Sequence, residues 1–124
     1  MIFLDTHVVV WLYADEKKRL SKAAREAIEA NDLRICPIVL MELEFLHEIK
    51  RIKVGAQEIF SFLQRRIGLA SEDKSFHHIC LATLSESWTR DPFDRLIVAH
   101  ARESKLVLVS KDALIRKNYD RTIW

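Results

Sequence analysis

Four acidic residues stand where a folded chain normally places apolar side chains or helix caps. Asp5 directly follows the apolar run 1–4, and Asp112 lies just past the apolar run 106–109. Glu42 and Asp94 fall on the apolar stripes of two predicted helices. A buried carboxylate destabilises a fold by on the order of several kcal/mol unless an ion pair, hydrogen bonds or a metal cation compensate it. These four side chains are therefore the candidates for chemistry.

Two of these acids are predicted to share one edge of a parallel sheet. Asp5 and Asp112 each follow a short apolar strand, and open parallel sheets bind ligands outside the carboxyl ends of their strands. The alternative for each residue alone is that it caps the helix that follows, which Asp does well. Both interpretations stay open for Asp5 and Asp112.

Glu42 is harder to explain as a surface residue. On a helix over residues 37–50, its neighbours one turn away are Ile38, Val39, Phe45 and Leu46. This stripe is expected to face the core, so Glu42 needs a partner. An Arg or Lys side chain is one alternative, and a metal ion is the other.

Asp94 repeats this pattern on a later helix, where Ile97 and Val98 follow it by one turn. The segment Asp91-Pro92-Phe93-Asp94 also fits a capped helix start, with Asp91 as N-cap and Pro92 at the first helical position. We therefore interpret Asp91 mainly as a cap. Asp94 can take part in both the cap and a metal site.

Four carboxylates brought together repel one another and raise the pKa of at least one of them. A bound Mg²⁺ or Mn²⁺ removes this conflict, because both ions prefer hard oxygen ligands and retain water. Zinc is less favoured by a set made only of carboxylates. The residues thus predict one divalent-cation site.

Short apolar strands alternating with helices must position these acids, which predicts an α/β fold with a parallel sheet covered on both faces. The expected strands cover residues 1–4, 33–36, 69–70, 106–109 and 122–124, and the expected helices cover 22–30, 37–50, 56–67, 76–85, 91–104 and 112–119. The stretch 8–12 is apolar nearly all round, which indicates burial in the core or at an interface.

Composition supports a single globular domain over residues 1–124, with 49% hydrophobic and 31% charged residues. The net charge of +2 does not by itself indicate a nucleic-acid binder. Cys36 and Cys80 are isolated and are expected to be reduced thiols of a cytoplasmic protein. The sequence has no signal-peptide pattern and no apolar run of membrane-spanning length.

The acidic residues lie in segments that resemble the ordered motifs of a PIN domain. These segments are residues 2–7, residues 38–43, residues 91–99 and residues 108–112. The similarity is strongest to the VapC type, the ribonuclease toxin of type II toxin–antitoxin pairs. It extends over essentially the whole chain, and the four motifs in order are far more specific than any one of them.

The resemblance implies an α/β/α sandwich around a central parallel sheet of about four to five strands. It also implies an acidic pocket that binds Mg²⁺ or Mn²⁺ through Asp5, Glu42, Asp94 and Asp112. We expect Asp5 and Asp94 to bind the metal directly and Glu42 and Asp112 to bind it directly or through water, with Asp91 as a possible further ligand. Thr6 and Ser110 match small hydroxyl positions that support the acids.

The implied activity is metal-dependent cleavage of RNA phosphodiester bonds, with a homodimer and a cognate antitoxin as partners. Phosphate contacts dominate nucleic-acid affinity, and Arg95 and Lys111, each next to a pocket acid, are the first candidates for them. Basic runs at residues 17–19, 50–53 and 65–66 are alternatives, although such runs are usually solvated surface.

Other conspicuous side chains have plainer expectations. Trp11, Tyr13 and Trp124 are expected in the core or an interface more than as platforms for bases. His7 is expected to bond locally beside the site, and His100 to lie on a helix surface.

Two competing functions remain from the residues. A PIN-fold module that only binds RNA or protein would not need the acids that this chain retains. A phosphatase with a strand-end aspartate would need a second acid two residues after Asp5, where this chain has His7.

Overall fold

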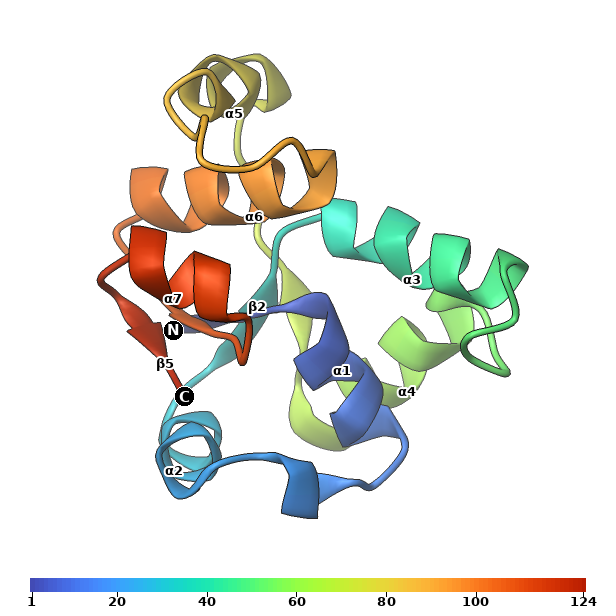
Figure 1. Cartoon of the computed structure of the whole chain (residues 1–124). Helices are drawn as coiled ribbons and strands as arrows, with labels where there is room; N and C mark the ends of the chain where they lie inside the picture. The colour runs from blue at the N-terminus through green and yellow to red at the C-terminus, as the bar shows by residue number, and fades with distance from the viewer.

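The computed structural model describes residues 1–124, and Figure 1 shows the arrangement of its elements. In chain order the elements are β1 (Ile2–Leu4), α1 (Thr6–Tyr13), the 3₁₀ helix η1 (Lys17–Arg19), α2 (Lys22–Ala30), β2 (Leu33–Ile35), α3 (Ile38–Glu48), α4 (Ala56–Ile67), β3 (Ala70–Ser71), α5 (Phe76–Thr83), α6 (Pro92–Glu103), β4 (Val107–Val109), α7 (Ala113–Asn118) and β5 (Thr122–Ile123).

The five strands form one parallel sheet in the order β3-β2-β1-β4-β5. The central strand β1 pairs with β2 and β4, and Leu4 lies in register with Val109. Successive residues of a strand point to opposite faces of a sheet, and Ile2, Phe3 and Leu4 are all buried. Both faces of the sheet are therefore covered, as the continuous apolar run predicted.

The helices pack on the sheet and on one another. Helix α3 contacts α1, α4 and α6, while α5 packs on the outside of α6 (Figure 1). Helices α2 and α7 contact the edge strand β5. None of these helices combines the length and the apolar character that a membrane crossing requires.

Side-chain caps fix the starts of several helices. Ser21 Oγ accepts a hydrogen bond from the Ala24 amide at the start of α2, as the Ser-led pattern predicted. The helix ends differ from prediction by small amounts: α3 ends at Glu48 and α5 at Thr83. The third strand is Ala70–Ser71, one residue later than expected. The buried Leu69 lies just before it.

Candidate metal centre

A pocket of about 220 Å³ opens at the edge of the sheet where β1 and β4 end. Residues from the starts of α1 and α6, the middle of α3 and the start of α7 face it, so segments far apart in the sequence meet there (Figure 1). Its lining residues are Asp5, Thr6, His7, Glu42, Leu46, Asp91, Asp94 and Asp112. All four acids singled out from the sequence, and Asp91 with them, line one cavity.

Strand register brings Asp5 next to Ser110. Leu4 pairs with Val109, so the residue after each strand lies at the same sheet edge. Ser110 Oγ donates a hydrogen bond of 2.6 Å to Asp5 Oδ2, and the Thr6 amide donates one of 2.8 Å to Asp5 Oδ1. Asp5 is 3% exposed and Ser110 is fully buried, so this carboxylate is held rigidly.

Thr6 connects α1 to Glu42 on α3. Its hydroxyl Oγ1 donates a hydrogen bond to Oε1 of Glu42, a residue that lines the pocket and whose Oε2 has no hydrogen-bond partner. Burial raises the pKa of Glu42, and the charges of Asp5 and Asp91 raise it further, while the bond from Thr6 lowers it. This acid therefore lies in an environment that disfavours its charged form.

Asp94 is the most strongly perturbed acid of the pocket. Partial burial and the neighbouring carboxylates of Asp91, Asp5 and Asp112 raise its pKa to about 7, with a smaller contribution from Glu42. No donor forms a hydrogen bond to its carboxylate. Asp94 thus feels the negative charge of the whole cluster without a hydrogen bond to offset it.

Asp112 and Asp91 both cap helices and face the pocket. Asp112 Oδ1 accepts from two backbone amides of α7 at 2.9 Å each, and its own amide donates to Ser110 Oγ at 3.1 Å. Asp91 Oδ1 accepts from the amides of Phe93 and Asp94. In each residue the second carboxylate oxygen makes no hydrogen bond. Asp91 and Asp112 therefore each cap a helix and also line the pocket, a combination that the sequence left open.

No lysine or arginine neutralises this cluster. Among the close contacts between basic and acidic side chains only His7 with Asp5 involves a pocket acid, with Nδ1 3.5 Å from Oδ2. The alternative of an Arg or Lys partner for Glu42 is therefore not realised. Buried Glu86 shows the contrast, because Arg102 Nε lies 2.7 Å from its Oε1 and the Trp88 indole donates to its Oε2.

The oxygens left free suit a hard divalent cation. Five carboxyl groups face a small polar cavity, and at least four of them have an oxygen with no hydrogen-bond partner in the protein. No three His, Cys, Asp or Glu side chains converge closely enough, as they stand, to hold an ion directly between them. Mg²⁺ commonly binds one or two carboxylates and keeps several waters, so an ion here would be held by one or two of these carboxylates and by water.

The two basic residues predicted beside the acids differ in availability. Arg95 Nε donates to the Thr89 carbonyl at 2.7 Å, so this guanidinium is partly engaged in holding the loop before α6. Lys111 is exposed, and its backbone amide donates to His7 Nε2 at 3.1 Å. His7 therefore lines the pocket and bonds to a residue 104 positions away, not locally in the chain as expected.

Three details of the surroundings were not as the sequence indicated. Phe45 is 52% exposed, so the stripe carrying Glu42 borders the pocket rim and not the deep core. Leu46, one turn after Glu42, is the apolar wall of the pocket and was not singled out, although its spacing of four residues was the available signal. His100 is 2% exposed and packs edge-on against Phe3, so the expectation of a surface histidine was wrong.

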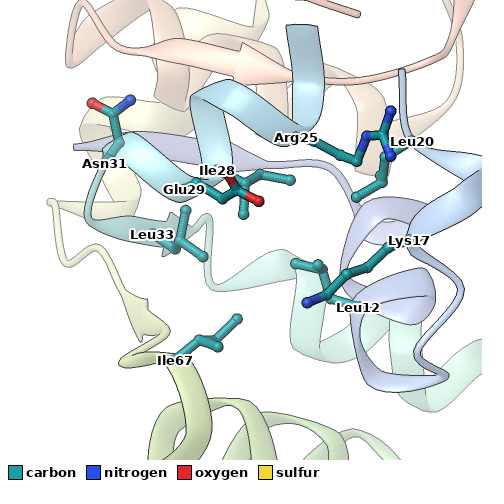
Figure 2. A pocket seen from close by; sticks show the side chains of 9 residues that line it. All are labelled: Leu12, Lys17, Leu20, Arg25, Ile28, Glu29, Asn31, Leu33 and Ile67. Atoms are coloured by element: carbon teal, nitrogen blue, oxygen red, sulfur yellow. The ribbon is translucent and has the colours of Figure 1, made fainter. Parts of the chain in front are cut away.

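A second hollow, of about 300 Å³, lies between α1, η1, α2 and the end of α4 (Figure 2). Its walls are mainly the aliphatic side chains of Leu12, Ile28, Leu33 and Ile67, and its only acid is Glu29. It lacks the carboxylate cluster that a metal centre needs. The acidic pocket is therefore the candidate site.

Comparisons with known proteins agree with this geometry. The PIN domain family model matches residues 2–120. The chain is 36% identical to Ribonuclease VapC22 of Mycobacterium tuberculosis, over 94% of this chain and 91% of that protein. The chain therefore belongs to the PIN domain family and is of the VapC type, as its ordered acidic motifs predicted.

Proposed function

We propose that this protein is a divalent-metal-dependent endoribonuclease and the toxin of a type II toxin–antitoxin pair. One observation carries the proposal: five carboxyl groups without a lysine or arginine partner line one pocket at the carboxyl edge of a parallel sheet. Membership of the PIN domain family and the similarity to a ribonuclease support the same activity.

We propose Mg²⁺ or Mn²⁺ as the cofactor, with Asp5 and Asp94 as direct ligands. Glu42 and Asp112 bind directly or through water, and Asp91 is near enough to the pocket to contribute. When bound, the cation activates water at neutral pH and neutralises charge on the phosphate oxygens. Because Asp94 must lose its proton to become a ligand, metal affinity rises with pH through about 7.

The rest of the chemistry lies in how the chain orients its carboxylates. Ser110 and the Thr6 amide fix both oxygens of Asp5, which keeps its remaining lone pairs directed at the pocket. The Thr6 hydroxyl holds Glu42 in the same way. Hydrogen bonds of this kind to metal ligands commonly change metal affinity or activity by about 10–100-fold.

The proposal extends to partners and to location. RNA is the substrate and an antitoxin protein is the regulator, in line with the VapC type. We also propose a homodimer, which is supported by exposed apolar side chains on α3 and α5, among them Met41, Phe76 and Leu81. Two unpaired cysteines support a cytoplasmic location. Light scattering measures the molar mass of the purified chain and so tests for the dimer.

The direct test is cleavage of single-stranded and structured RNA by the purified chain, with Mg²⁺ and Mn²⁺ titrated separately. Wild type is expected to cleave and EDTA to stop it. Asp5→Asn and Asp94→Asn are each expected to lower the cleavage rate by about 100-fold or more, because each removes a proposed direct ligand. Isothermal titration with Mn²⁺ measures the loss of metal binding independently of activity.

Asp120→Asn is the matched control, because it removes an exposed carboxylate outside the pocket. It is expected to cleave and to bind Mn²⁺ like wild type. Cleavage by both pocket variants at the wild-type rate would show that the activity resides elsewhere. A wild-type chain that binds RNA and never cleaves it would favour the inert PIN-fold module instead.

A further inference from the structure

A row of aromatic rings leads away from the acidic pocket. His7 lines the pocket, and Trp11 follows it by one turn on α1 with the ring centroids 4.9 Å apart. Trp124, just after β5, continues the row with its ring 5.8 Å from that of Trp11. None of the three rings is fully buried. The row is thus a partly exposed aromatic surface that begins at the candidate metal centre.

Two cations lie over the central ring of this row. Lys111 Nζ is 6.0 Å and Arg19 Cζ is 5.8 Å from the Trp11 ring centroid. Arg19 also pairs with Glu16, whereas Lys111 is exposed and has no carboxylate partner. A lysine held only by an exposed cation–π contact, worth about 0.5–1 kcal/mol, is easily released toward a stronger anionic partner.

Aromatic rings beside free cations are the combination that binds single-stranded nucleic acid. Bases stack on the rings without strong sequence preference, and cations hold the phosphates. The five carboxyl groups of the pocket repel a phosphate backbone, so the strand must be held from outside the pocket. Trp11 and Lys111 form a positively charged rim that begins beside His7 of the pocket.

The other aromatic pair near the pocket has no cation over its rings. Phe45 and Phe93, on α3 and α6 beside Glu42 and Asp94, have ring centroids 6.1 Å apart. No cation lies over either ring; the cation–π contacts of the chain involve only Trp11, Phe62 and Tyr119. The cation–π contacts beside the pocket therefore lie on the α1 side, and we favour this side for RNA.

We propose that Trp11 and Lys111, with His7 between them and the acids, form the subsite for the nucleotide next to the cleaved phosphate of single-stranded RNA. Lys111 moves from the indole to a phosphate oxygen, and a base stacks on the indole surface that this movement frees. The inference rests on the proposed ribonuclease activity and adds the side from which the strand enters. Trp11, which the sequence placed in the core or an interface more than as a platform for bases, thereby gains a binding role.

The test uses the full chain, Mn²⁺ and a short fluorescein-labelled single-stranded RNA, with a second copy of the RNA carrying abasic positions. Wild type is expected to cleave the abasic RNA with a KM raised by about tenfold, since stacking of one base contributes this much or more. Lys111→Ala and Trp11→Leu are expected to raise KM for intact RNA by a similar factor and to leave kcat within about threefold. Trp11→Leu is also expected to lose the preference for intact over abasic RNA.

Lys74→Ala is the matched control, because it removes an exposed lysine from the loop before α5. Trp11 also packs against the core, so thermal melting is recorded for each variant. Trp11→Phe is included as a milder change and is expected to keep part of the preference for intact RNA. The subsite would be refuted by a result in which both Lys111→Ala and Trp11→Phe keep the wild-type KM and the wild-type preference for intact over abasic RNA. A wild type without any RNA cleavage would instead refute the proposed function.

Discussion

Replacing Asp94 by asparagine is expected to stabilise the metal-free protein while abolishing its activity. The carboxylate is half-buried among Asp5, Asp91 and Asp112, and its pKa rises from 3.8 to about 7. An amide of the same shape removes the charge that the neighbours repel. The metal centre is thus expected to be a local weakness of the fold when no cation is bound.

The size of the effect follows from linkage between protonation and folding. Between pH 3.8 and about 7 the folded chain keeps a proton that the unfolded chain has lost, so stability falls as pH rises through this window. A difference of roughly 3 pKa units corresponds to about 4 kcal/mol. Because solvent reaches Asp94, screening reduces this figure, and we expect a gain of ~2 kcal/mol for Asp94→Asn near pH 8.

Urea unfolding in EDTA at several pH values measures this gain. The difference between variant and wild type should be near zero at about pH 4 and should grow toward pH 8. Adding Mn²⁺ should stabilise wild type more than the variant, because the ion binds only the folded carboxylate cluster. A variant equal to or weaker than wild type near pH 8, or a difference that does not change with pH, would refute the reasoning.

Two further predictions concern the residues around the pocket and beneath it. Ser110→Ala removes the donor to Asp5 and the acceptor for the Asp112 amide. It should lower the free energy of unfolding by about 1–3 kcal/mol and weaken Mn²⁺ binding. An unchanged Mn²⁺ affinity in isothermal titration calorimetry would contradict this prediction. Burial lowers the pKa of His100 from 6.5 to about 4, so wild type should lose up to ~3 kcal/mol as pH falls from 6.5 to 4. His100→Phe should lack that loss in urea unfolding, and an identical pH profile for the two proteins would show that His100 is not its source.

The residues that carry the fold and the site could be found from the sequence because their signals are local. Asp5 and Asp112 directly follow apolar runs that form β1 and β4, and Asp91-Pro92 is a helix start in any context. Parallel pairing then places the strand ends together without further information. The family and the α/β sheet were confirmed for this reason.

The errors came from contacts between distant segments. His100 reads as a surface residue because Arg102 and Glu103 follow it, yet α5 and β1 bury its ring. Phe45 lies on an apolar stripe, yet about half of its side chain is exposed, which the stripe alone did not indicate. The position of Trp11 under Lys111 depends on β4 lying beside β1, and no local pattern contains that pairing.

The hydrogen bond from Ser110 to Asp5 joins residues 105 positions apart in the chain. During synthesis the N-terminal part emerges first and domains fold as units. A nascent chain that ends before β4 already contains Asp5, Glu42 and Asp94, but β1 has no neighbour on one side and Asp5 has no serine hydroxyl. The hydrogen-bonded arrangement of Asp5 in the full chain therefore needs β4, so the candidate site is complete only when most of the chain has been synthesised.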